Sequence, residues 1–370
     1  MTRRARPLRL AAIACLAALG LTTLPSSSVA DEQREGRNPG LPYPDCVEMD
    51  SQPCESFPPD FVDQTSWLNF PQVGLAGSIP ARQWTRVPLT MVAASIQFGY
   101  AYPGEQANDF TYYIRAFFTS PSGSKHPYGD SALIPIRTVV FGSIPVTATL
   151  QVSQRRDGNG LPYPLIFQPH DHQEYQPRAG IEFIKTIESA TLEDRVDVRV
   201  RDVTVDGVDL RLGSSCGTGP TAQLSVSNRK LVVETPYGYE STTGFGKLED
   251  EFDPKIDQFG IQGGALQGTL DIPAFTGCAT ASGDDISPIL TAAVSGPDNP
   301  LMIRVGATNC TNYGTDEDGA FISIPNQPGV ESPDDPRSGC SPSPHPNPRI
   351  VTVPDQFEIP DYAPGEEPND

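Results

Sequence analysis

The alternation of apolar and polar residues along the chain is the strongest constraint on its fold. Within residues 144–152 every second residue is apolar, and threonine or glutamine fills most of the positions between. This period of two is typical of β-strands that bury one face. Residues 110–119 repeat it with aromatic residues on both faces, which suggests burial on both sides. We therefore expect the chain to fold mainly into antiparallel strands.

A third alternating segment, residues 196–205, ends at the dipeptide Asp206-Gly207 and resumes at Val208. Asp-Gly between alternating runs predicts a tight hairpin, because both central residues of such a turn need a positive φ. The alternation slips by one residue at Asp202, which indicates a β-bulge. Residues 181–192 fit a helix or a strand. Further strands are expected near residues 87–102, 223–235, 266–275, 301–306 and 321–324.

One short segment has the features of a helix. Ser287 is placed to cap it, Pro288 sits where a missing N–H costs nothing, and Gly296-Pro297 ends it. Many short strands with a single helix favour an all-β, antiparallel, sandwich-like architecture. The length of the strand-rich body favours two domains.

The two ends of the chain differ from this body. Residues 1–30 have four arginines, an apolar segment and small residues before Ala30, which together predict a secretory signal peptide. The apolar segment is shorter than the roughly 20 residues of a spanning helix, which disfavours a membrane anchor at this end. No transmembrane helix is expected in the chain after removal of the signal peptide. The predicted organisation is a signal peptide at 1–30, an irregular disulfide-pinned arm at 31–65, β domains at 66–178 and 179–326, and a proline-rich acidic tail at 327–370.

Charge and cysteine content narrow the class of protein. Removal of the predicted signal peptide leaves 22 basic and 46 acidic residues, a net charge of −24, which disfavours nucleic acid as a partner. In an exported chain the remaining cysteines predict up to three disulfides. The favoured pairs are Cys46 with Cys54, Cys216 with Cys278, and Cys310 with Cys340.

Histidines at 170 and 172 form the most chemically suggestive polar cluster. Alternate residues of an extended segment project to one side, so His170 and His172 could bind a transition metal if His126, Asp130 or Glu174 supplied a third ligand. The plainer interpretation is an exposed loop with no cofactor. An irregular calcium site at residues 316–319 is a further alternative, although the spacing does not fit an EF-hand.

Two short catalytic patterns occur but lack the required context. Residues 213–217 match Gly-x-Ser-x-Gly, yet the pattern follows an antiparallel hairpin and includes Cys216. Residues 227–230 match Ser-x-x-Lys, but we expect them in a hairpin turn between residues 224–226 and 231–233. Neither pattern predicts an active site.

Three stretches, 209–216, 272–278 and 289–297, carry a resemblance to a group of known sequences. They resemble uncharacterised secreted β-rich proteins of actinobacteria, over Val196 to Cys310. The shared features are cysteines and turns. The resemblance therefore implies an exported, disulfide-bearing β domain and implies nothing about its activity.

The sequence therefore favours a secreted or cell-wall protein that binds an unknown envelope or extracellular ligand without enzymatic activity. One alternative is an envelope β-barrel or pore subunit, because amphipathic hairpins also suit a channel wall. The other is a secreted hydrolase assisted by a metal at His170 and His172. Most of the unusual residues of the sequence are explained by disulfides, strands and turns. We therefore favour the non-enzymatic hypothesis over the two alternatives.

Overall fold

The computed structural model describes residue 41 and residues 67–104, 107–140, 143–178, 181–229, 231–236, 263–306, 312–315, 321–324 and 357–366. These residues form antiparallel strands, loops and one short helix, α1 (Ser287–Val294). The predicted all-β class with a short helix is thus confirmed.

The strands of this part of the chain are, in order, β1 (Trp67–Ser78), β2 (Gln83–Gly104), β3 (Ala107–Phe118), β4 (Ile134–Val140), β5 (Ile144–Gln154), β6 (Leu165–Arg178), β7 (Ile181–Val205), β8 (Val208–Asp209), β9 (Gly217–Thr218), β10 (Ala222–Ser227), β11 (Leu231–Pro236), β12 (Gly264–Ile272), β13 (Phe275–Thr276), β14 (Gly296–Val305), β15 (Asn312–Thr315) and β16 (Phe321–Ile324). The predicted strands at 110–119 and 144–152 correspond to β3 and β5. The ambiguous segment 181–192 is the first half of β7.

Eight of these strands form a closed barrel. Their order around it is β1, β2, β3, β6, β7, β10, β12 and β14, and β14 pairs back with β1. The sequence led us to expect sandwich-like packing. Alternation requires only that each strand bury one face, and a closed sheet satisfies this as well as two stacked sheets do.

Apolar side chains from all eight strands fill the barrel. The buried cluster includes Phe70 of β1, Val92 of β2, Phe118 of β3, Leu165 of β6, Leu192 of β7, Leu224 of β10, Leu266 of β12 and Leu301 of β14. Each fully buried side chain of this kind stabilises the fold by about 1.5–3 kcal/mol. The interior is therefore a packed core.

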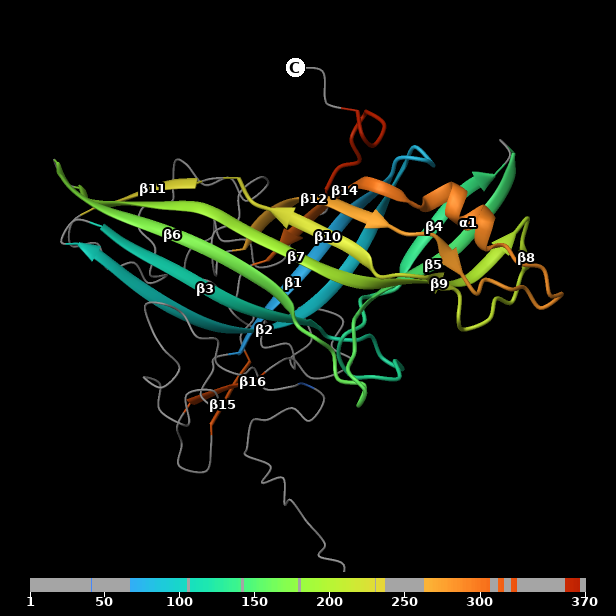
Figure 1. Cartoon of the computed structure of the whole chain (residues 1–370), viewed down its shortest axis with the longest axis horizontal. Helices are drawn as coiled ribbons and strands as arrows, with labels where there is room; N and C mark the ends of the chain where they lie inside the picture. Colours follow the sequence, from blue (N-terminus) through green and yellow to red (C-terminus); the bar gives the residue numbers. More distant parts are fainter. Residues whose placement is uncertain are drawn as a thin grey trace, which may run out of the picture. The chain divides into compact units, whose positions relative to one another are not determined.

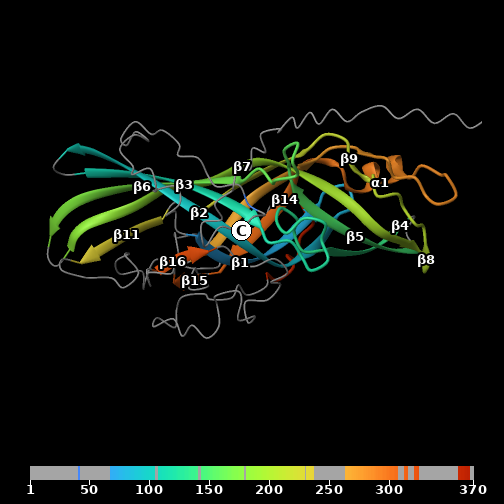
Figure 2. The same cartoon turned by 90° about the horizontal axis from the view of Figure 1, so that it is seen from below.

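Four barrel strands continue past the core in one direction. Beyond Ser95, the last β2 residue paired with β1, the strands β2, β3, β6 and β7 remain paired with one another, and β11 adds to β7. We call this five-stranded sheet the extension. Figure 1 shows it on the left, and Figure 2 shows the same strands from below. Among the described strands, β2 and β11 form its two outer edges.

The opposite end carries β4, β5, β8, β9 and α1, on the right of both views. The predicted Asp-Gly hairpin is confirmed there: Val205 pairs with Val208, and Asp206 and Gly207 have φ values of 49° and 79°. The predicted bulge is confirmed as well. Asp202 has a φ of 47° where the β5–β7 register shifts.

We expected a hairpin turn at residues 227–230, but β10 and β11 each pair with β7 rather than with each other. Asn228 instead bonds Ala190 of β7, donating its backbone N–H to the Ala190 oxygen and accepting the Ala190 N–H at its side-chain oxygen. This contact keeps the segment after β10 next to β7. As a result, β10 and β11 pair one after the other with the same edge of β7.

The predicted boundary between two β domains falls between β6 and β7. These two strands pair with each other from Phe167 to Arg178. Strands from both sides of the boundary, such as β1 and β14, pair directly in the one barrel.

Part of the acidic tail is docked on this body. Residues 357–366 lie against the β1–β2 end: the Trp84 indole N–H donates to the Tyr362 oxygen at 3.2 Å, and Arg304 lies over the Phe357 ring at 4.9 Å. Arg82 and Glu366 form an exposed ion pair at 2.7 Å. Of the predicted arm at 31–65 only Leu41 is described, and it is buried in a cluster with Ala93, Phe117 and Tyr128; the other residues of the arm and the rest of the tail lie outside the described residues.

Candidate functional site

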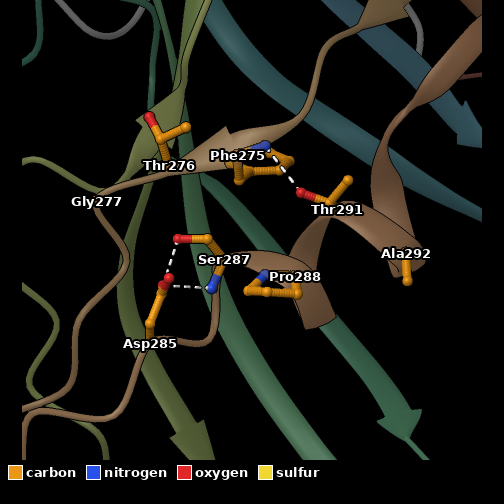
Figure 3. Close-up of a pocket in the computed structure, with 8 residues that line it drawn as sticks. All are labelled: Phe275, Thr276, Gly277, Asp285, Ser287, Pro288, Thr291 and Ala292. Carbon is orange, nitrogen blue, oxygen red and sulfur yellow. Dashed lines mark hydrogen bonds between the residues drawn. The ribbon is translucent and has the colours of Figure 1, made fainter.

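An open pocket lies beside the start of α1 (Figure 3). Its volume is about 480 Å³, and it is bounded by Phe275 to Gly277 on one side and by Asp285, Ser287 and the first turns of α1 on the other. Figure 3 shows Ser287 and Asp285 pointing toward each other below the β13 strand.

The polar side chains of this pocket form hydrogen bonds with one another and with backbone N–H groups. The Ser287 hydroxyl donates to Asp285 Oδ1 at 2.6 Å and accepts the Cys278 N–H at 3.1 Å. Thr291 Oγ1 accepts the Phe275 N–H at 2.9 Å. Ser287 is therefore the first helical residue and links α1 to Cys278, rather than capping the helix as we predicted; α1 has no side-chain cap.

Electrostatics also argue against a nucleophilic serine here. Hydrogen bonds from the Ser287 hydroxyl and N–H lower the pKa of Asp285 below its ordinary value of 3.8. A carboxylate with a lowered pKa is a weak general base at neutral pH. The Asp285–Ser287 pair therefore fits a structural role better than hydrolysis.

The predicted disulfide between Cys216 and Cys278 is confirmed. Both cysteines are buried, and the bond joins the loop before β9 to the loop between β13 and α1. The Gly-x-Ser-x-Gly pattern lies on this crosslink, and Ser215 Oγ donates to the Gly277 oxygen at 3.1 Å. The pattern is thus part of the disulfide loop. Cys46, Cys54, Cys310, Cys340 and the calcium candidate at 316–319 lie outside the described residues.

His170 and His172 lie on β6 within the extension, and both are half-buried. They occupy strand positions, so the plainer interpretation of this segment as an exposed loop was wrong. On β3, Thr111 is the register partner of His170 and Asp109 that of His172. Of the three third ligands that we considered, Glu174 is also on β6, at the register position of Ala107.

The other two, His126 and Asp130, belong to a different cluster. Asp130 forms an ion pair with Arg156 at 3.2 Å, and Arg156 also donates to the Tyr128 and Gly160 oxygens. Burial, followed by the nearby Arg156 charge, lowers the pKa of His126. These residues fasten the loop after β3 to the loop after β5.

Sequence reasoning missed a buried amide that links the end of β5 to the end of β3. Gln154 is 1% exposed at the end of β5; its amide donates to the Ala116 and Tyr163 oxygens, and its oxygen accepts the Phe118 N–H. A polar residue at the last position of an alternating strand was the only available signal, and it does not distinguish a buried amide from an exposed one.

Among the side chains that the structure describes, no group of three His, Cys, Asp or Glu residues is placed to hold a metal ion. Within the same part of the chain, no helix is long and apolar enough to cross a membrane. Comparisons with protein-family models, curated proteins and solved structures found no match to this chain.

Proposed function

We propose that the chain is an exported, non-enzymatic binding protein of the cell envelope or its surroundings. The observation that carries this proposal is the division of the strands into two parts. Eight strands enclose a filled apolar core, and four of them continue into the extension. The packed barrel is a rigid support, and the extension is a sheet that a partner can bind.

Three features support an exported, non-catalytic role. The first thirty residues have signal-peptide composition, and the Cys216–Cys278 disulfide suits an oxidising compartment. The pocket beside α1 uses its serine and carboxylate in hydrogen bonds to each other and to backbone N–H groups. The excess of acidic residues favours solubility and disfavours anionic partners.

The extension is the part of the molecule that we expect to bind. Its outer strands, β2 and β11, have backbone edges with no partner among the described strands, and such edges can receive an added strand from another protein. A second strand-bearing molecule or an extended peptide of the envelope is the class of partner that this geometry suits.

Shortening one hairpin tests this proposal. Replacing residues 98–112 with Asn-Gly joins the register partners Gln97 and Tyr113 by a tight turn and leaves the β2–β3 pairing inside the barrel intact. As a matched control, replacing residues 139–145 shortens the β4–β5 hairpin at the opposite end, between Thr138 and Val146.

Binding is measured as the fraction of protein retained by isolated cell walls and released by salt. We expect the β2–β3 variant to lose retention and the β4–β5 variant to keep it, with both showing the near-ultraviolet dichroism of the unaltered protein. Equal retention by all three proteins would overturn the assignment of binding to the extension.

A pore subunit is the second candidate, favoured by the same extension. The five paired strands of the extension, with outer edges on β2 and β11, could join those of further copies into a larger closed sheet. This candidate requires a defined oligomer that depends on detergent.

A further inference from the structure

Residues 357–366, which we call the tail segment, contact the barrel without being part of its sheet. None of them pairs with a described strand, and the barrel closes through β14 and β1 without them. Their hydrogen-bond partners at the β1–β2 end lie 271 to 284 positions earlier in the chain. The tail segment, red in Figure 1, is therefore held on the barrel as a peptide ligand would be.

The tail segment lies on the outer side of three neighbouring barrel strands. On β14, Leu301, Ile303 and Val305 belong to the core, so the residues between them point outwards. The register of β14, β1 and β2 places one set of residues on this side: Val73, Leu75 and Gly77 of β1, Trp84 and Arg86 of β2, and Met302 and Arg304 of β14. We call this set the outer face. Its middle strand is apolar, and guanidinium groups lie on both sides.

Side chains of the outer face bind backbone oxygens of the tail segment. The Trp84 indole N–H donates to the Tyr362 oxygen at 3.2 Å, and the Arg86 guanidinium donates to the Phe357 oxygen. Because every peptide has backbone oxygens, these bonds fix the path of an extended chain without restricting its sequence. Aromatic surfaces that recognise extended, proline-containing segments share this property.

Two aromatic side chains of the tail segment make contacts that do depend on sequence. The Phe357 ring lies 4.9 Å from the Arg304 guanidinium, and the Tyr362 ring meets Trp84 edge-on, with 6.4 Å between the ring centroids. Cation–π and edge-to-face contacts of this kind favour aromatic residues at both positions. The outer face therefore selects for two aromatic residues five positions apart.

The end of the tail segment has a shape that its own sequence fixes. Pro364 is buried against Gly77, where an added Cβ would lie 3.0 Å from the Pro364 Cβ. The Glu366 N–H donates to the Ala363 oxygen at 3.0 Å, and Gly365 has a φ of 82°, which fits a type II turn. A proline and a turn restrict the unbound segment, so less conformational entropy is lost on binding.

The tail segment and the barrel surface beneath it carry opposite charges. The chain has a net charge of −20, yet three arginines lie on or beside the outer face: Arg82, Arg86 and Arg304. The tail segment contains three carboxylates: Glu358, Asp361 and Glu366. The one ion pair, Arg82 with Glu366, is exposed and adds little affinity. Opposite charges instead favour encounter with an acidic peptide and disfavour a basic one.

We propose that the outer face is a binding surface for an extended, acidic peptide of another protein that carries aromatic residues and a proline in the spacing of Phe357, Tyr362 and Pro364. The tail segment occupies this surface as the chain's own ligand, and an incoming peptide must displace it. No residue of the outer face belongs to the extension, so this proposal does not rest on the proposed function.

A labelled synthetic peptide of residues 357–366 is the probe, and fluorescence anisotropy measures its binding to the full chain. The Phe357→Ala/Tyr362→Ala variant should release the tail segment and bind the probe saturably, one to one. The unaltered chain should bind it at least about 10-fold more weakly, because a tethered ligand competes at an effective concentration on the order of 1 mM.

Matched variants separate recognition from general effects of the tail. Ile359→Ala/Asp361→Ala changes two exposed side chains of the same segment and should bind the probe as weakly as the unaltered chain. Trp84→Phe, made in the released variant, keeps an aromatic ring but loses the N–H donor, and should weaken probe binding about 5-fold. Tyr362→Ala alone should give an intermediate affinity, so it remains informative if the double variant fails to fold.

The proposal is overturned if the released variant does not bind the probe, or if the unaltered chain binds it equally tightly. It is also overturned if a peptide of scrambled sequence binds as well, because the attraction would then come from charge alone. Retention on cell walls is a separate measurement, so a failure of peptide binding would leave the proposed function of the extension standing.

Discussion

The Cys216–Cys278 disulfide allows a quantitative prediction of stability. The bond closes a loop with a sequence separation of 62 residues. A crosslink of this length lowers the conformational entropy of the unfolded chain, which corresponds to about 4 kcal/mol at 25 °C. We therefore expect the Cys216→Ala/Cys278→Ala double variant to be less stable than the unaltered protein by at least this amount.

Loss of packing adds to the loss of stability caused by removing the crosslink. Both cysteines are buried in the described structure, and Cys216 and Cys278 belong to the main apolar cluster. Removing two buried sulfur atoms adds a loss on the order of 1 kcal/mol through packing. The crosslink is nevertheless the larger contribution.

Urea unfolding of the two oxidised proteins measures the difference. Because the unfolded variant is less constrained and exposes more surface, its m-value should also rise. A difference in unfolding free energy below about 1 kcal/mol, with unchanged m, would refute the reasoning. It would mean that the chain around Cys216 is held equally well without the bond.

Two further predictions concern single side chains. Gly268→Ala should destabilise the barrel by about 3 kcal/mol or prevent folding, because an added Cβ would clash with the Ser225 oxygen where β10 meets β12. Gly158→Ala, where an added Cβ meets nothing within 4 Å, should change the urea midpoint little, and equal effects of the two substitutions would contradict the packing argument. Ser287→Ala should raise the pKa of Asp285 toward its ordinary value in a carboxyl NMR titration, while Ser282→Ala should not, since Ser282 bonds Asp284. Because the folded pKa is lowered, the part of the stabilisation that comes from the hydrogen bonds between Ser287 and Asp285 is present above the ordinary carboxyl pKa and is lost as the pH falls through the folded value. The stability gap between Ser287→Ala and the unaltered protein should therefore shrink in acid to the part due to the Cys278 N–H bond, and a gap of the same size at every pH would contradict the argument.

Local patterns predicted the local structure well. The turn at Asp206-Gly207 and the bulge at Asp202 follow from the positive φ values that short polar residues and glycine accept. The strand β5 follows from strict alternation. The cysteine pair 216 and 278, favoured among the possible pairings, was also predicted correctly.

Longer-range features could not be predicted, for physical reasons. Alternation reports burial of one face, which a barrel and a sandwich provide equally. The polar residues near 228 resembled a turn, but Asn228 bonds Ala190 and keeps the chain on the edge of β7. The spacing of His170 and His172 was visible in the sequence, whereas their position on β6, opposite β3, follows only from the register of the sheet.

The central claim is that a filled barrel carries a binding surface outside the cell without forming a channel. Fractionation of producing cells into medium, salt-washed cell wall and detergent extract, with the native mass of each pool, tests it most directly. Our account predicts a processed monomer in the medium or in the salt wash. Recovery only in detergent, as a defined oligomer, would contradict it and favour the pore subunit.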